Sequence, residues 1–173
     1  MRLAALLPLL CAAAALGQTP AAPPAPAAAT SVPPQTLRVL PTGGLRVETA
    51  ALLLSGQEGG NLPLAVLALP LPGGAGGQAR VPVVVEADGT ALLVGHEEGP
   101  LRVEVCLYAL GAGGGVEAAL LNTVEIQPAG LATVEKSGLR FEAELLLPPG
   151  EVSLRVLVRT AAGKILGLRQ VAL

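Results

Sequence analysis

The chain has very few aromatic side chains. Its 173 residues contain no Trp, and the only two aromatic residues are Tyr108 and Phe141. Large aromatic side chains supply much of the contact area at binding hot spots, and their faces stack on planar ligands. Their scarcity argues against a surface that stacks on carbohydrates or nucleobases.

Charge of either sign is also sparse. The chain has 11 basic and 13 acidic residues, for a net charge of -2, and it has no run of basic residues. A protein that binds nucleic acid through phosphate contacts needs a concentrated basic surface. We therefore expect no nucleic-acid partner.

The groups that catalysis needs are nearly absent. The chain has one histidine, His96, and one aspartate, Asp88, and none of its four serines lies in a nucleophile-elbow motif. No glycine-rich loop ends in Gly-Lys-Ser/Thr, which excludes a phosphate-binding loop of that type. We predict no catalytic, cofactor-binding or metal-ligating residue, no cofactor and no enzyme activity.

Two groups of acidic residues suggest a metal site or a glycosidase site, but each has a simpler interpretation. His96 lies beside two glutamates, but a stable metal centre needs three or four ligands, so we expect a solvated loop histidine. Glu142 and Glu144 share the outward side of one predicted strand, whereas glycoside hydrolysis needs carboxylates across a cleft. We expect them to be solvated charges near Arg140 or Arg155.

Residues 1–17 have the pattern of a signal peptide. Arg2 precedes an apolar run over residues 3–16, and Ala15-Leu16-Gly17 is a small-x-small cleavage pattern. The run of 14 residues is shorter than the ~20 needed to span a bilayer, although an uncleaved anchor is the alternative. We expect an exported protein, periplasmic or extracellular, with no transmembrane span in the mature chain.

Cleavage would leave Cys106 as the only cysteine. One cysteine forms no internal disulfide, so the exported domain would depend on its core for stability. Free cysteine is among the most buried residue types. We therefore expect Cys106 to be a buried small apolar residue, with a reactive exposed thiol as the alternative.

Residues 18–34 form a Pro/Ala-rich linker with six prolines and no charge. Such a segment favours polyproline II and acts as a spacer, at ~3.1 Å per residue. A proline-rich ligand for a recognition domain is the alternative.

From residue 37 onward, short apolar segments alternate with glycine-rich turns. The pattern predicts an N-terminal extension over 35–61, with one or two strands, and a β-sandwich domain over 62–173. Strands are expected at 37–40, 44–54, 62–70, 79–87, 100–110, 116–126, 139–147, 151–159 and 164–172. A short helix within 116–125 is the alternative for that segment.

The clearest pattern is a pair of alternating segments joined by Pro148-Pro149-Gly150. Apolar residues alternate with polar ones on both sides of this corner, as in half-buried strands. The two strands could form a hairpin, which would set Glu144 opposite Arg155. Alternatively, the corner leads from one sheet of a sandwich to the other.

Two further residues give local predictions. Pro82 lacks a backbone donor, so we expect its strand to lie at a sheet edge or to carry a bulge. Asp88-Gly89 is a tight-turn signal between strands. The whole pattern predicts an all-β fold, an Ig-like or fibronectin-III-like antiparallel β-sandwich of about seven to nine strands.

Several short motifs resemble the C-terminal Ig-like region of bacterial VWFA-related domain proteins. The resemblance covers residues 37–173 and rests on the segments Leu62-Pro-Leu-Ala, Ala79-Arg-Val-Pro-Val-Val-Val-Glu, Tyr108-Ala-Leu, Gly138-Leu-Arg-Phe, Leu147-Pro-Pro-Gly and Leu154-Arg-Val-Leu-Val-Arg. It implies an accessory, non-catalytic domain.

The chain departs from this family at three points. It has no Asp-x-Ser-x-Ser motif and no room for a von Willebrand A domain, so no metal role carries over. Val152 stands where the family has an aromatic residue after the corner, and Gly111 stands where an aspartate is common. Without the aromatic hydroxyl, packing alone must hold the corner.

The functional hypothesis is an exported, non-catalytic module that binds another envelope protein or acts as a scaffold. The sheet edge expected at the strand of Pro82 is the candidate surface, because unpaired backbone accepts a partner strand. The alternative is a stand-alone spacer or remnant domain with no specific partner.

Overall fold

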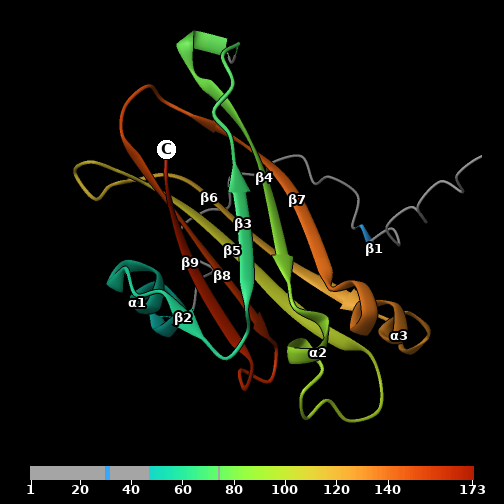
Figure 1. The fold of residues 1–173 in the computed structure, drawn as a ribbon. Coiled ribbons are helices and arrows are strands. Elements are labelled where there is room, and N and C mark those ends of the chain that lie inside the picture. Colours follow the sequence, from blue (N-terminus) through green and yellow to red (C-terminus); the bar gives the residue numbers. More distant parts are fainter. Residues whose placement is uncertain (1–29, 32–46, 74) are drawn as a thin grey trace, which may run out of the picture.

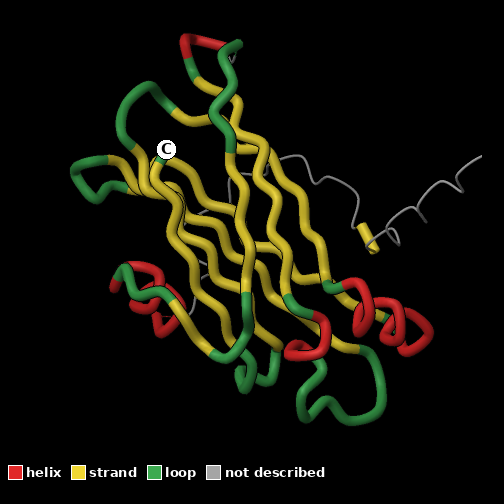
Figure 2. The backbone as a smooth tube through the Cα atoms, in the orientation of Figure 1, coloured by secondary structure: helices red, strands yellow, loops and turns green. Residues whose placement is uncertain are grey.

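The computed structural model describes residues 30–31, 47–73 and 75–173, and these form two packed β-sheets (Figures 1 and 2). All strand pairs are antiparallel except β1 with β7. The four-stranded sheet has the order β1 (Thr30–Ser31), β7 (Leu139–Leu147), β4 (Ala79–Ala87), β3 (Leu64–Ala68). The five-stranded sheet has the order β2 (Gly59–Gly60), β9 (Leu166–Ala172), β8 (Val152–Thr160), β5 (Leu101–Gly111), β6 (Val116–Ile126).

The predicted all-β sandwich is therefore confirmed. The bounds of β4, β6 and β7 coincide with the predicted strands, and the helix considered within 116–125 is wrong, because that segment is β6. Burial alternates along β4 and β7, and the inward residues fill the space between the sheets. Val83, Phe141 and Val156 are each at most 1% exposed in this core.

The Pro-Pro-Gly corner leads from one sheet to the other. β7 belongs to the four-stranded sheet and β8 to the five-stranded sheet, so Glu144 does not lie opposite Arg155. The buried Val152 exchanges backbone hydrogen bonds with Leu173, at 3.2 and 2.8 Å. Backbone bonding to the C-terminus, and not packing alone, therefore holds the corner.

The strand predicted at 44–54 is wrong where the structure describes it, because α1 spans Val47–Ser55. Alanine and leucine dominate this segment, and both favour helices. Gly56 follows with φ of 66°, which suits the residue just beyond a helix C-terminus. Alternation over so short an apolar segment did not separate a strand from a helix.

The strand turn predicted at Asp88-Gly89 is also wrong. Asp88 is the N-cap of a short helix, α2 (Gly89–Leu92), and its Oδ1 accepts a hydrogen bond from the Ala91 N–H at 2.7 Å. Gly89 lies so close to α3 that a Cβ there would be 1.8 Å from the Val134 carbonyl oxygen. Only glycine permits this contact.

α3 (Pro128–Ser137) has no counterpart among the predicted elements. Pro128 begins it and Gly138, with φ of 76°, ends it. Proline at the first turn and glycine just past the end are common helix boundaries. A 3-10 turn, η1 (Ala75–Gly77), lies at the tip of the β3–β4 hairpin.

The edge predicted for the strand of Pro82 is wrong, because β4 lies between β3 and β7 and pairs with β7 without a bulge. The Leu69 N–H donates to the Pro82 carbonyl at 3.3 Å, which places the missing Pro82 donor on the side of β3. β3 ends at Ala68, one residue earlier. The proline therefore shortens its neighbour and leaves the β7 ladder intact.

The N-terminal predictions fall mostly outside the described residues. The signal peptide over 1–17, the strand at 37–40 and most of the linker over 18–34 are among them. Thr30 and Ser31 of the linker pair in parallel with Leu139 and Arg140 at the start of β7.

Candidate interaction surfaces

The outer face of the four-stranded sheet has an apolar column along β3. Cross-strand register places Ala65 and Leu67 in line. The Leu69 bond to Pro82 and an isolated bridge from Leu71 to Arg80 continue the line. Leu67, Leu69 and Leu71 are 67%, 56% and 42% exposed. We call these three residues the leucine column. A row of exposed apolar side chains is typical of a surface that binds another protein, so the leucine column is the main candidate interaction surface.

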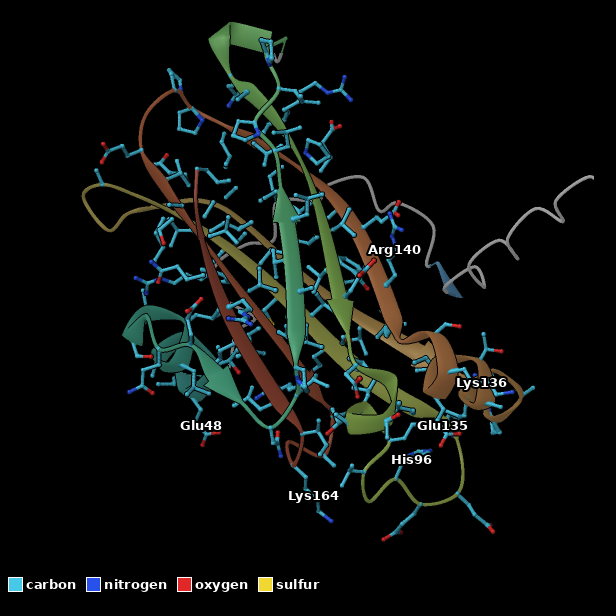
Figure 3. The ribbon with its side chains drawn as sticks, viewed as in Figure 1. Glu48, His96, Glu135, Lys136, Arg140 and Lys164 are labelled. Carbon is cyan, nitrogen blue, oxygen red and sulfur yellow. The ribbon has the colours of Figure 1, made fainter. Side chains whose placement is uncertain are left out.

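The charges beside the leucine column are paired with one another. The Arg80 guanidinium contacts Glu144 at 2.6 Å, and Arg140, labelled in Figure 3, contacts Glu142 at 2.8 Å and Glu86 at 3.9 Å. The hydrogen bond from Arg80 lowers the pKa of Glu144 below its ordinary value. The expected partner Arg140 is confirmed for Glu142, whereas Glu144 pairs with Arg80 of β4 and not with Arg155.

A shallow hollow of about 440 Å³ continues the leucine column at the hairpin end of the sheet. It is formed by the two ends of the β3–β4 hairpin together with the Pro-Pro-Gly corner, and Leu71 belongs to its wall. Its lining is Pro70, Leu71, Pro72, Gly73, Gly77, Gln78, Ala79 and Pro149. No charged side chain lines it, so the hollow extends the apolar character of the column.

The backbone edge of β3 offers little room to a partner strand. Odd-numbered residues bond to β4, so the even-numbered residues face outward. The Arg169 Nε donates to the Leu64 carbonyl at 3.1 Å, and Pro70 has no N–H. Only Val66 and Ala68 remain unblocked between them. A short edge closed at both ends in this way resists strand addition.

The outer face of the five-stranded sheet is covered by α1. Leu53, 1% exposed, packs in a cluster with side chains of β5, β8 and β9, namely Cys106, Tyr108, Leu110, Leu157 and Leu168. The Arg155 Nη1 donates to the Leu53 carbonyl at 2.5 Å, at the end of the helix. A cation at a helix C-terminus also interacts favourably with the helix dipole.

Cys106 lies beneath α1 and is fully buried, which confirms the buried apolar interpretation. Burial chiefly raises the pKa of its thiol to about 12, while the nearby Arg159 lowers it and Glu104 raises it. Arg159 and Glu104 themselves form an ion pair at 2.6 Å across β8 and β5. A thiol with this pKa is not a nucleophile near neutral pH.

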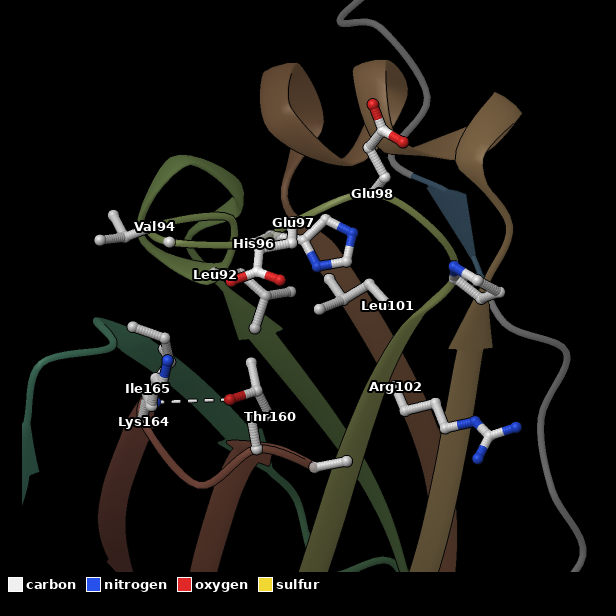
Figure 4. Close-up of a pocket in the computed structure, with 14 residues that line it drawn as sticks. Leu92, Val94, His96, Glu97, Glu98, Leu101, Arg102, Thr160, Lys164 and Ile165 are labelled. Atoms are coloured by element: carbon white, nitrogen blue, oxygen red, sulfur yellow. Dashed lines mark hydrogen bonds between the residues drawn. The ribbon is translucent and has the colours of Figure 1, made fainter.

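A pocket of about 340 Å³ lies at the α2 end of the sandwich, beside His96 (Figure 4). The His96 Nε2 lies 3.2 Å from the Gly99 carbonyl, and His96 is half-buried, so it is less solvated than predicted. Glu97 and Glu98 are exposed. The described residues contain no group of three metal-ligating side chains.

The leucine column was not predicted from the sequence, because Pro82 favoured its own strand as the partner surface. A signal was present. The segment 62–70 is apolar at both parities, unlike 139–147, which alternates with charges. In a strand that is buried on one face only, apolar residues at both parities leave some of them in solvent.

None of the helices in the described part of the chain is long and apolar enough to span a membrane.

No protein-family model matches the chain, and no curated protein matches it. The X-ray structure of Northeast Structural Genomics Consortium target SoR45 superposes with a TM-score of 0.41 at 10% identity, over 65% of this chain and 85% of that chain. Bacteroides uniformis beta-glucuronidase 2, covalently bound to cyclophellitol-6-carboxylate aziridine, superposes with a TM-score of 0.32 at 13% identity. That match covers 65% of this chain and only 12% of the enzyme. Neither likeness carries an argument about function.

Proposed function

We propose that this protein is an exported, non-catalytic β-sandwich module that binds an apolar surface of another envelope protein. The observation that carries the proposal is the leucine column, with its three leucines between 42% and 67% exposed on the one outer sheet face that no described helix covers. Export is supported by the signal-peptide pattern of residues 1–17.

The partner's chemistry follows from the charges on this face. Arg80, Arg140 and their glutamates already form ion pairs within the chain. A partner therefore supplies no counter-charge, and its contribution is apolar contact with the leucine column and the neighbouring hollow. The accessory role implied by the resemblance to VWFA-related proteins agrees with such a partner, and it is part of the proposal.

The test is affinity capture from envelope extract with the wild type and two double variants. Leu67→Ser with Leu69→Ser removes the column, whereas Leu54→Ser with Val94→Ser changes two residues that are 57% and 62% exposed on other surfaces. All four positions are exposed, so each change should alter stability by less than about 0.5 kcal/mol. We expect the first variant alone to lose its partner.

Two results would contradict the proposal. The wild type could capture no specific partner, which would favour the spacer or remnant alternative. The partner could also remain bound to the Leu67→Ser, Leu69→Ser variant as tightly as to the wild type, which would assign binding to another surface.

A further inference from the structure

The outer edge of β6 is a second exposed surface. β6 is the last strand of the five-stranded sheet, as β3 is the last strand of the four-stranded sheet. The Ala161 N–H donates to the Arg102 carbonyl at 2.9 Å. The backbone N–H and C=O groups of even-numbered β5 residues therefore bond to β8, and those of odd-numbered residues bond to β6. Val103 pairs with Val124. The even-numbered residues of β6 therefore bond to β5, and the odd-numbered ones direct their N–H and C=O groups outward.

This edge is open where the edge of β3 is closed. A register shift falls near Glu117, and from Ala118 to Ile126 the pairing with β5 is regular. The outward-directed residues of that stretch are Ala119, Leu121, Thr123 and Glu125. They include no proline, and among the described residues no strand pairs with them. An open edge of this length is a template for another strand.

Asn122 is the midpoint of the regular stretch and points toward the core. It lies opposite Val105, and its inward neighbours along β6, Leu120 and Val124, are 5% and 9% exposed. Asn122 is half-buried, and its amide makes no hydrogen bond to another described residue. The amide is not fully buried, so water can satisfy it, and a second amide at this edge would take the place of that water.

We propose that a second copy of this chain occupies the edge, with its β6 antiparallel to the first about a two-fold axis at Asn122. Opposed residues that do not exchange backbone bonds have Cα atoms ~4.5 Å apart, which brings the two Asn122 side chains together. Each carboxamide has both donors and an acceptor, so the two amides satisfy one another. The strand is therefore complementary to itself at this position.

The charges of β6 also agree with this register. It sets Leu121 opposite Thr123 of the second copy and Ala119 opposite Glu125 of the second copy, with about eight backbone hydrogen bonds across the axis. A register centred on Leu121 would instead set Glu117 opposite Glu125, and opposed like charges destabilise a strand pair. The Asn122 register avoids that repulsion.

The dimer would join two five-stranded sheets into one continuous sheet. An axis perpendicular to the sheet keeps both leucine columns on the same side of the assembly. The inference does not rest on the proposed function, because β6 and the leucine column belong to different sheets. If both hold, the dimer binds its partner with two sites at once.

Sedimentation of the purified full chain between about 1 and 100 μM tests the proposal, since even a weak interface is populated at the upper limit. We expect a concentration-dependent dimer. Ala119→Pro removes an outward donor without removing a bond to β5, and it should raise the dissociation constant at least about tenfold. Ala68→Pro is the matched control, because it makes the same change at the closed edge of β3, and it should leave the dimer intact.

A second variant separates the proposed contact from a loss of folding. Asn122→Asp sets two carboxylates together at the axis, so the dimer should weaken at about pH 7 and recover at about pH 4, near the ordinary pKa of aspartate. A wild type that is monomeric at the highest concentration overturns the proposal. So does a dimer unaffected by Ala119→Pro, or an Asn122→Asp dimer without this pH dependence. Because no other protein is present, failure here is distinct from failure of the capture experiment.

Discussion

The two sheets of this sandwich present very different outer faces. The apolar side chains on the outer face of the five-stranded sheet are covered by α1, and Cys106 beneath it is fully buried. On the four-stranded sheet the leucine column is left in solvent beside a set of paired charges. An apolar residue on an outward-facing position therefore does not by itself mark a binding surface. What matters is whether another element of the same chain covers it.

The same contrast appears between the outer edges of β3 and β6. β3 is short, and Arg169 and Pro70 close it at either end. β6 is 11 residues long and carries no such protection in the described structure. The four-stranded sheet therefore exposes its outer face to a partner. The five-stranded sheet instead exposes the backbone edge of β6.

Truncation of one leucine on each face gives the largest expected difference. Leu53→Ala removes a buried side chain from the α1 cluster and should lower the free energy of unfolding by about 2–4 kcal/mol. Leu67→Ala, the same substitution at a position 67% exposed, should cost less than about 0.5 kcal/mol. Urea unfolding measures both. Equal losses would mean that α1 does not cover its sheet face in solution.

The attachment of α1 is sharpened by Arg155→Met, which keeps most of the side-chain stem and removes the donor to the Leu53 carbonyl. We expect a loss of about 1–2 kcal/mol in unfolding free energy. In a Cys11→Ala background, where Cys106 is the only thiol, α1 should open more often and Cys106 should react faster with a thiol reagent.

The matched control is Arg169→Met, which removes a guanidinium donor to another backbone carbonyl, that of Leu64. It should leave the labelling rate of Cys106 unchanged, because Arg169 does not hold α1. If both variants accelerate labelling equally, Cys106 is exposed by global unfolding and not by release of α1.

The smallest expected effect concerns the paired charges of the four-stranded sheet. Because the pKa of Glu144 is lowered in the folded state, its pairing stabilises the fold above the ordinary glutamate pKa. That contribution is lost as the pH falls through the folded pKa. An NMR titration of the Glu144 carboxyl group should show a lowered midpoint, which Arg80→Gln raises toward the ordinary value of about 4.3. Lys164→Gln, at an exposed cation of the other sheet's hairpin, should leave it unchanged.

Much of the strand pattern could be predicted from the sequence, because alternation is a local property. The bounds of β4, β6 and β7 follow from it, and so does the sandwich. The interval from Val47 to Ser55 could not be assigned this way, since a short apolar segment is compatible with a strand or a helix. The absence of catalytic groups remains a prediction from composition.

The candidate surface was harder to predict, because it depends on the order of strands within each sheet. Pro82 favours an edge in isolation, yet β4 accommodates it centrally by ending β3 early. Asn122 gives no signal until β6 lies at the end of its sheet. Neighbours in a sheet come from distant parts of the chain, and no local pattern specifies them.

Local alternation in the sequence predicts the period-2 segments and the turns between them. A composition poor in His, Asp and aromatic residues leaves the absence of catalytic and stacking sites a prediction. The packing of distant segments sets which sheet face α1 covers and which strands form the edges. It also leaves the leucine column and Asn122 where another protein could reach them. Alternation specifies only which side chains share a face of a strand. Burial depends on what is packed against that face.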